Sequence, residues 1–117
     1  MQRKAFKAGE TIFKTGDKSD LAYVIVVGGV DISVQGEAGE VKIASLEPGE
    51  VFGEMGLIDA GPRSADAHAN QYTVCAGYDG DELLDLLDND PGEAVVFIKT
   101  LIRRLREANR SLTAGKS

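Results

Sequence analysis

Short runs of apolar residues alternate with polar ones over residues 6–51, and glycine, aspartate and serine separate these runs. Such alternation is typical of β-strands with one buried face, and closely spaced strands favour an all-β sandwich or barrel over βαβ units. The run at 22–27 is the most apolar and predicts a central strand. Residues 30–34 and 41–46 predict two further strands, and the segment 36–39 predicts the hairpin loop that joins them.

Glycine, proline and polar residues mark the remaining turns of this region. These turns are predicted at residues 8–9, 15–17 and 48–49. A further pair of strands is predicted at 65–69 and 72–78, around Asn70-Gln71. Strands of this length and spacing predict a jelly-roll β-roll over about residues 4–78.

The hydrophobic period changes after residue 78, where a helix is predicted to begin. Residues 79–82, Asp-Gly-Asp-Glu, have the spacing of a capping box, in which the first and last side chains bond each other's backbone N–H groups. Three leucines give this helix an apolar side: Leu83, Leu84 and Leu87.

A second start signal at residues 90–93, Asp-Pro-Gly-Glu, predicts a long helix that ends near Leu112. Its apolar residues recur in steps of four and three and form one seam, which consists of Ala94, Ile98, Leu101, Leu105, Ala108 and Leu112. Its basic residues occupy other faces: Lys99, Arg103, Arg104, Arg106 and Arg110. The seam spans about two heptads, too few to predict a coiled coil, so it can pack on the roll or against a second copy.

Length and charge narrow the function classes. A chain of 117 residues can bury one core, so we expect a single domain over 1–117 with its C-terminal helices at about 79–112. The net charge of −6 and the isoelectric point near 4.7 disfavour direct nucleic-acid binding. The sequence contains no apolar run of transmembrane length and no signal-peptide pattern, so we expect no membrane span and a cytoplasmic location.

Residues that would support catalysis or a metal centre are scarce. Cys75 is the only cysteine, which excludes an internal disulfide and a cysteine-rich metal site. His68 is the only histidine, which excludes a multi-histidine centre. The acidic residues at 79–90 lack the spacing of an EF-hand loop, and helix capping explains them better. Because no constellation of nucleophile, base and oxyanion donors appears, we expect neither a metal site nor an enzyme.

Residues 52–65 carry the strongest candidate for a ligand site. A strand that ends at Gly53 turns directly into a short predicted helix at 54–58, whose first N–H groups favour an anion. After the turn at Gly61-Pro62, Arg63 can reach the same anion, and its guanidinium suits bidentate phosphate binding. Glu54 would be repelled by a phosphate, so we expect it to accept hydrogen bonds from hydroxyl groups. Phosphate beside hydroxyl groups indicates a sugar phosphate.

The order Phe-Gly-Glu-Met-Gly-Leu-Ile at 52–58 and Pro-Arg-Ser-Ala at 62–65 resembles the phosphate-binding cassette of cyclic nucleotide-binding domains. These domains occur in bacterial catabolite-activator-type regulators, cyclic-nucleotide-gated channels and cyclic-AMP-dependent kinase regulatory subunits. The resemblance implies that Glu54 binds the ribose 2′-hydroxyl, Arg63 binds the cyclic phosphate and Ser64 tunes the choice of purine. The ligand-binding residues that it implies are Gly53, Glu54, Met55, Gly56, Arg63, Ser64 and Ala65.

Segments 6–17, 22–28 and 46–52 also resemble the family's strands and turns, so the resemblance covers nearly the whole chain. It implies a mainly β fold, a jelly-roll β-roll (double-stranded β-helix) with a short cassette helix and two C-terminal helices. It further implies a regulatory module that binds cyclic AMP, with cyclic GMP as the alternative, and that signals by moving its C-terminal helices. The last helix would then contact a protein partner or a second copy of the chain.

Asp66 departs from the family's pattern, because this position usually carries threonine, valine or another uncharged residue. Strand alternation places Asp66 on the same side as Ser64. A carboxylate that faced the phosphate would weaken binding, whereas one turned to solvent would be harmless. Two rival functions stay open: a degenerate domain that serves as a protein-interaction module without ligand, and a cupin-like enzyme, against which the missing histidine ligands argue. Arg63 itself is expected in a surface cleft and not in the core.

Overall fold

The computed structural model describes residues 1–54, 61–92, 94–95 and 99. The predicted cassette helix therefore lies outside the described residues, apart from Glu54. The same holds for the predicted last helix, except for residues 91, 92, 94, 95 and 99, which are helical. By its internal contacts the chain divides into two units, residues 1–83 and 84–117.

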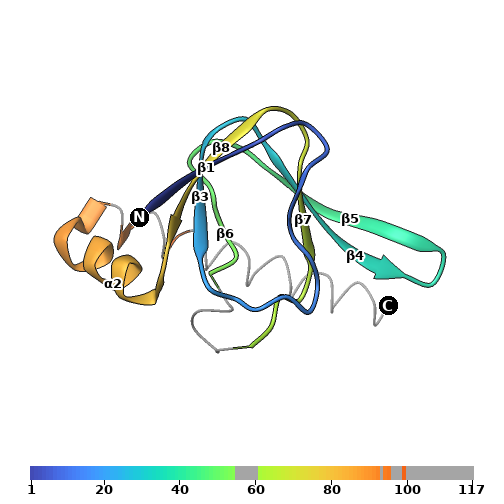
Figure 1. The fold of residues 1–117 in the computed structure, drawn as a ribbon. Coiled ribbons are helices and arrows are strands. Elements are labelled where there is room, and N and C mark those ends of the chain that lie inside the picture. The colour runs from blue at the N-terminus through green and yellow to red at the C-terminus, as the bar shows by residue number, and fades with distance from the viewer. Residues whose placement is uncertain (55–60, 93, 96–98, 100–117) are drawn as a thin grey trace. The chain divides into compact units, whose positions relative to one another are not determined.

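Within the described residues, eight β-strands form two four-stranded antiparallel sheets (Figure 1). The first sheet has the order β1 (Gln2–Phe6), β8 (Thr73–Tyr78), β3 (Ala22–Val27) and β6 (Val51–Phe52). The second sheet has the order β2 (Thr11–Phe13), β7 (Asp66–Ala69), β4 (Val30–Gly36) and β5 (Gly39–Leu46). This arrangement confirms the mainly β, jelly-roll class that the strand pattern predicts.

Most of the strand predictions are confirmed, with one difference in pairing. β3 covers the predicted residues, and β4 and β5 form the predicted hairpin, closed by the pairing of Gly36 with Gly39. The strands predicted at 65–69 and 72–78 occur as β7 and β8, but they do not pair with each other. β7 pairs with β2 and β4, whereas β8 pairs with β1 and β3, so the chain passes from one sheet to the other at Asn70 and Gln71.

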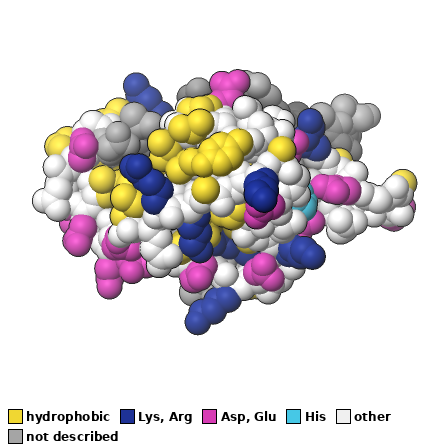
Figure 2. Space-filling view, turned by 45° about the horizontal axis from the view of Figure 1, so that its top comes forward, with side chains coloured by type: hydrophobic (Ala, Val, Ile, Leu, Met, Phe, Trp, Pro, Cys, Tyr) yellow, Lys and Arg dark blue, Asp and Glu magenta, His cyan; other side chains and the backbone are white. Residues whose placement is uncertain are grey.

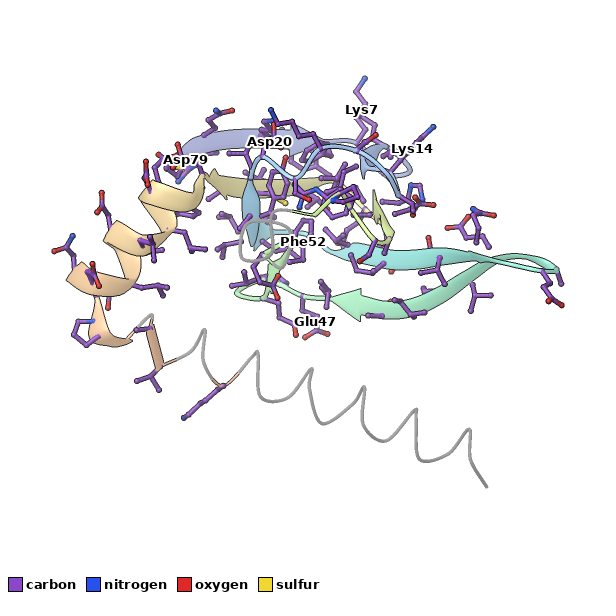
Figure 3. All side chains as sticks on the ribbon, turned by 90° about the horizontal axis from the view of Figure 1, so that it is seen from below. Lys7, Lys14, Asp20, Glu47, Phe52 and Asp79 are labelled. Atoms are coloured by element: carbon purple, nitrogen blue, oxygen red, sulfur yellow. The ribbon has the colours of Figure 1, made fainter. Side chains whose placement is uncertain are left out.

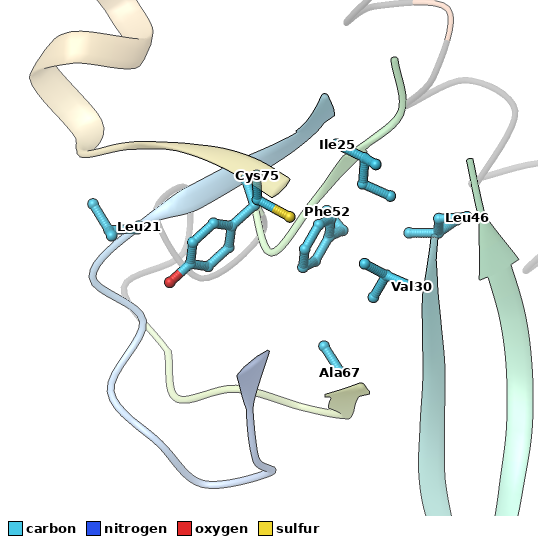
Figure 4. Packing of buried hydrophobic residues seen from close by; sticks show 8 residues of the cluster. Leu21, Ile25, Val30, Leu46, Phe52, Ala67 and Cys75 are labelled. Atoms are coloured by element: carbon cyan, nitrogen blue, oxygen red, sulfur yellow. The ribbon is translucent and has the colours of Figure 1, made fainter. Parts of the chain in front are cut away.

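The inward-facing side chains of the two sheets form the hydrophobic core (Figure 4). Its buried members are Leu21, Tyr23, Ile25, Val30, Leu46, Phe52, Ala67 and Cys75. Figure 4 shows the ring of Phe52 among these side chains, and in Figure 3 Lys7 and Lys14 point away from the sheets. Burial raises the pKa of the Cys75 thiol to about 11, so the thiol stays protonated at neutral pH.

Some large apolar side chains remain exposed, and one face of the molecule shows apolar side chains gathered beside basic ones (Figure 2). The exposed side chains on the strands are Val26, Val27, Val41 and Ile43. Exposed apolar side chains are common in folded proteins, because polar groups cannot cover the whole surface.

The helix α2 (Gly80–Asn89) begins with the predicted capping box. The backbone N–H of Asp79 donates to Glu82 Oε1 at 3.1 Å, and the backbone N–H of Glu82 donates to Asp79 Oδ1 at 2.8 Å. The predicted apolar side needs a correction, because Leu83 is buried but Leu84 is 61% exposed. No helix among the described residues is long and apolar enough to cross a membrane.

Candidate functional site

The backbone at Arg63 is fixed by the turn that follows β2. The N–H of Arg63 donates to the carbonyl of Asp17, and the N–H of Gly16 donates to the carbonyl of Arg63, both at 2.8 Å. Gly16 has a φ of 91°, so this tight turn needs a residue that tolerates the left-handed region. The predicted turn at 15–17 therefore holds the start of the segment that leads into β7.

The guanidinium of Arg63 points into the protein. Arg63 is only 5% exposed, and its Nη1 and Nη2 atoms donate to the carbonyl oxygens of Gly53 and Leu21 at 2.8 and 2.6 Å. Nη2 also lies 3.8 Å from Oδ1 of the exposed Asp20. The expectation that Arg63 lies in a surface cleft is therefore wrong. Its charged group is buried because the carbonyl oxygens of Gly53 and Leu21 accept hydrogen bonds from it.

Aromatic rings line the guanidinium. Its Cζ atom lies 4.1 Å from the centroid of the Phe13 ring and 5.9 Å from that of Tyr23. The centroids of Phe13 and Phe52 are 6.0 Å apart, and those of Tyr23 and Phe52 are 5.3 Å apart. A cation over an aromatic face is attracted by the negative face of the ring, and more strongly when it is desolvated. The aromatic cluster thus replaces part of the hydration that Arg63 loses.

Gly53 makes room for this arrangement. Its φ is 75°, in the left-handed region. A Cβ atom at this position would lie 2.6 Å from Arg63 Nη1 and 3.2 Å from the Phe13 ring. The positive φ therefore favours glycine, and an added Cβ would displace the guanidinium from its present position.

The second charged group of the site is Glu54, which follows Gly53 directly after β6. It is 1% exposed. Burial lowers the pKa of Arg63 from its ordinary value, and the negative charges of Asp20, Asp17 and Glu54 oppose this effect. Because a buried charge is costly unless opposite charges or hydrogen bonds compensate it, the charge of Glu54 helps to keep Arg63 ionised.

Arg63 keeps donors for a further partner. A guanidinium carries five N–H groups, and the two carbonyls bond only two of its three nitrogens. The Nε atom is buried and makes no hydrogen bond to the part of the chain that the structure describes. A buried, ionised donor of this kind favours an anionic ligand that can accept from it.

The carboxylate of Asp66 has neither of the two expected orientations, towards the phosphate or towards solvent. It faces neither the candidate anion nor open solvent, because it is 9% exposed and accepts hydrogen bonds from the backbone N–H and the hydroxyl of Thr15 at 2.7 and 3.0 Å. These bonds, the backbone one first, lower the pKa of Asp66. The carboxylate therefore fastens the turn at 15–17 to β7, and its charge is engaged there.

The structure brings together part of the predicted residue set. Gly53, Glu54 and Arg63 meet at the end of β6, whereas Ser64 is exposed and Ala65 is half-buried. Met55 and Gly56 lie outside the described residues. Sequence reasoning missed Phe13 and Leu21, which contact Arg63 from 50 and 42 positions away. No local motif marks them, although the alternation in the first strands could have indicated that Phe13 faces inwards.

No group of three or more histidine, cysteine, aspartate or glutamate side chains in the described part of the chain could hold a metal ion. Glu54 and Arg63 are buried charged side chains of the candidate site. Together they offer one acceptor of hydroxyl hydrogen bonds and one donor to an anion.

Comparisons with known proteins point to one family. A model of the cyclic nucleotide-binding domain matches residues 3–90. The cyclic AMP receptor protein of Thermus thermophilus is 37% identical over 112 residues, which cover 95% of this chain and 52% of that protein. A cGMP-dependent protein kinase of Toxoplasma gondii is 40% identical over 103 residues, which cover 88% of this chain and 10% of the kinase.

Among solved structures, the crystal structure of the Thermus thermophilus catabolite activator protein is similar to this chain, with a TM-score of 0.85 and 36% identity. The alignment covers 98% of this chain and 55% of that one. The chain thus spans about half the length of the bacterial regulators that it matches.

Proposed function

The chain belongs to the cyclic nucleotide-binding domain family, and from this premise we propose that it binds cyclic AMP as a regulatory module without enzymatic activity of its own. Arg63 binds the cyclic phosphate, and Glu54 accepts a hydrogen bond from the ribose 2′-hydroxyl. Ser64, which is exposed beside Arg63, contacts the phosphate or the purine. Gly53, Met55, Gly56 and Ala65 complete the site.

Two side chains of opposite charge are buried at the end of β6, and this burial supports the proposal most strongly. Glu54 is 1% and Arg63 is 5% exposed, and a hydrogen bond from Arg63 reaches the residue before Glu54. Burying two ionised groups often costs more than an apolar pair would, so stability alone does not account for them. A ligand that carries both a phosphate and hydroxyl groups uses both charges.

The choice of cyclic AMP follows from the names of the relatives. The Thermus thermophilus relative is a cyclic AMP receptor, whereas the Toxoplasma gondii relative is a kinase dependent on cGMP. The bacterial relative aligns with more of its own length, which favours cyclic AMP. Cyclic GMP is the alternative ligand.

We further propose that residues 1–117 form one domain that acts in the cytoplasm. In this domain the C-terminal helices transmit the occupancy of the nucleotide site. The predicted apolar seam of the last helix and its basic flank then form the contact with a protein partner or a second copy. The ligand shifts the equilibrium between two positions of these helices only to the extent that its affinity differs between the two positions. The main argument for the alternative, a degenerate domain that binds no ligand, is the charge of Asp66. This argument is weakened because the Asp66 carboxylate accepts hydrogen bonds from Thr15.

Isothermal titration calorimetry tests the assignment of both charges. Wild-type protein is titrated with cyclic AMP, cyclic GMP, adenosine and 2′-deoxy-cyclic AMP. We expect cyclic AMP to bind, adenosine to bind far more weakly, and removal of the 2′-hydroxyl to weaken binding about tenfold, the size of a hydrogen bond to a charged group. The proposed function would be rejected if the heats of injection for both cyclic AMP and cyclic GMP equalled those of dilution into buffer.

A variant isolates the role of Glu54. In Glu54→Gln the preference for cyclic AMP over its 2′-deoxy form should shrink to about twofold, because the charge that strengthens the hydrogen bond is lost. Glu37→Gln, in the exposed turn of the β4–β5 hairpin, is the matched control and should keep the wild-type preference. An unchanged preference in Glu54→Gln would reassign the ribose contact to another residue.

A further inference from the structure

The ring of Phe13 has a fixed relationship to Arg63 that the register of the second sheet sets. Phe13 is the last residue of β2 and pairs with Ala67 of β7, the strand that Arg63 precedes. The turn after β2 then bonds the backbone of Arg63 through Gly16 and Asp17. Two independent main-chain connections thus bring the ring and the guanidinium together.

Among the contacts of the guanidinium, the three shortest restrict its plane. The carbonyls of Gly53 and Leu21 accept from its two terminal nitrogens, and the Phe13 ring covers it at 4.1 Å from Cζ. Two acceptors alone would still allow the group to tilt about the line that joins them, whereas a ring beside the carbon restricts this tilt. Nε is then held in one direction, buried and without a hydrogen bond to the described residues.

We propose that Phe13 is a positioning residue of the anion site, whose ring holds the Arg63 guanidinium ready for a phosphate. This inference rests on the proposed function, because it takes Arg63 as the phosphate-binding group. A long, flexible arginine side chain loses rotamer freedom when it binds, and a group that is already fixed loses less. The ring therefore raises affinity without touching the nucleotide itself.

A purely structural role for Phe13 makes a different prediction. Phe13 is half-buried and packs against the core, and so does Phe6 of β1. No cation–aromatic contact is recorded between Phe6 and an arginine or lysine of the described residues. Loss of either ring therefore costs core packing, but only the loss of Phe13 frees the guanidinium.

The test compares three variants of the whole chain: Phe13→Leu, Phe13→Tyr and Phe6→Leu. Calorimetry measures the dissociation constant for cyclic AMP, and ¹⁵N NMR follows the Nε–H resonance of Arg63 in the unliganded protein. We expect Phe13→Leu to weaken binding about tenfold, the size of a desolvated cation–π contact, and to shift the Arg63 Nε–H resonance. Phe13→Tyr, which keeps the aromatic face, and Phe6→Leu should stay within about twofold of wild type with little change in this resonance.

The outcomes separate this inference from the function on which it rests. Equal affinities for Phe13→Leu and Phe6→Leu, with an unmoved Arg63 resonance, would reject the positioning role while leaving cyclic AMP binding intact. A failure of Phe13→Tyr to restore affinity would also reject it, because the aromatic face is then irrelevant. Absence of binding by the wild-type protein would reject the proposed function itself.

Discussion

The Nη1 atom of Arg63 lies 2.8 Å from the carbonyl oxygen of Gly53, the residue that directly precedes the buried carboxylate of Glu54. The same guanidinium donates to the carbonyl of Leu21 at 2.6 Å. Arg63 therefore links the end of β6 and the segment before β3, in addition to its candidate role towards a ligand.

This double role predicts that Arg63→Ala affects folding as well as binding. The variant leaves the carbonyls of Gly53 and Leu21 without their donor, so the free energy of unfolding should fall by roughly 1–3 kcal/mol. Binding of cyclic AMP should weaken by roughly 1.5–3 kcal/mol, the range for a hydrogen bond to a charged group. Urea unfolding and calorimetry measure the two effects separately.

The exposed Lys18, in the same region, supplies the control. Lys18→Ala removes an exposed positive charge that forms no ion pair within residues 1–54 and 61–92, and the stability of this variant should lie within about 0.5 kcal/mol of wild type. If Arg63→Ala proved as stable as Lys18→Ala, the guanidinium would not be the internal link described above.

Gly53→Ala should lower stability and ligand affinity by more than the positive φ of residue 53 alone would cause. The new Cβ would meet Arg63 Nη1 at 2.6 Å, whereas at Gly49, whose φ is 90°, a Cβ would meet no atom within 4 Å. Gly49→Ala should cost roughly 1–2 kcal/mol of stability for the left-handed conformation and leave ligand affinity unchanged. Gly53→Ala should cost more and weaken cyclic AMP binding, as unfolding and titration experiments would show. Equal effects at both positions would mean that the guanidinium moves aside freely.

Asp66→Ala should destabilise the domain in a pH-dependent manner. The hydrogen bonds from Thr15 lower the pKa of Asp66 below its ordinary value of 3.8, so its contribution is present above that pH and is lost as pH falls through the lowered value. Loss of the bonded carboxylate should cost roughly 1.5–3 kcal/mol at pH 7. The gap between wild type and variant should then narrow below about pH 4. A gap that stayed constant from pH 7 to pH 3 would show that the Asp66 charge contributes nothing.

Local patterns could predict the strands and the helix start, but not the interior of the site. Alternation and glycine turns suffice for β3 and the β4–β5 hairpin, and the capping box at Asp79 and Glu82 needs only its own four residues. The role of Asp66 depends on Thr15, 51 positions earlier in the chain. Its partner could be found only once β2 and β7 were known to pair.

The burial of Arg63 escaped prediction for a related reason. An arginine after a glycine–proline turn suggests an exposed cleft, because a lone charge avoids the core. Here the acceptors are main-chain carbonyls, which any residue carries and which leave no trace in the sequence. The separation of β7 and β8 into different sheets likewise depends on long-range pairing and not on the short segment between them.

Hydrogen exchange with and without cyclic AMP tests the proposed signalling. Protection should rise at residues 54–65 and should also change across residues 97–112, because the ligand favours one of two helix positions. The peptide that covers the β4–β5 turn at Glu37 and Ala38 serves as an internal reference and should exchange identically. If residues 54–65 alone responded, the domain would bind its ligand without transmitting the signal through its C-terminus.

Thermal unfolding of the wild-type protein with and without cyclic AMP is the most direct test of cyclic nucleotide binding, because the ligand stabilises only a state that binds it. At a hundredfold excess over its dissociation constant, cyclic AMP should add about 2.7 kcal/mol to the free energy of unfolding, a shift in Tm on the order of 10 °C for a domain of this size. Adenosine at the same concentration should shift Tm far less, because it lacks the phosphate for Arg63. A melting curve that neither cyclic AMP nor cyclic GMP shifts at millimolar concentration would show that the domain binds neither nucleotide.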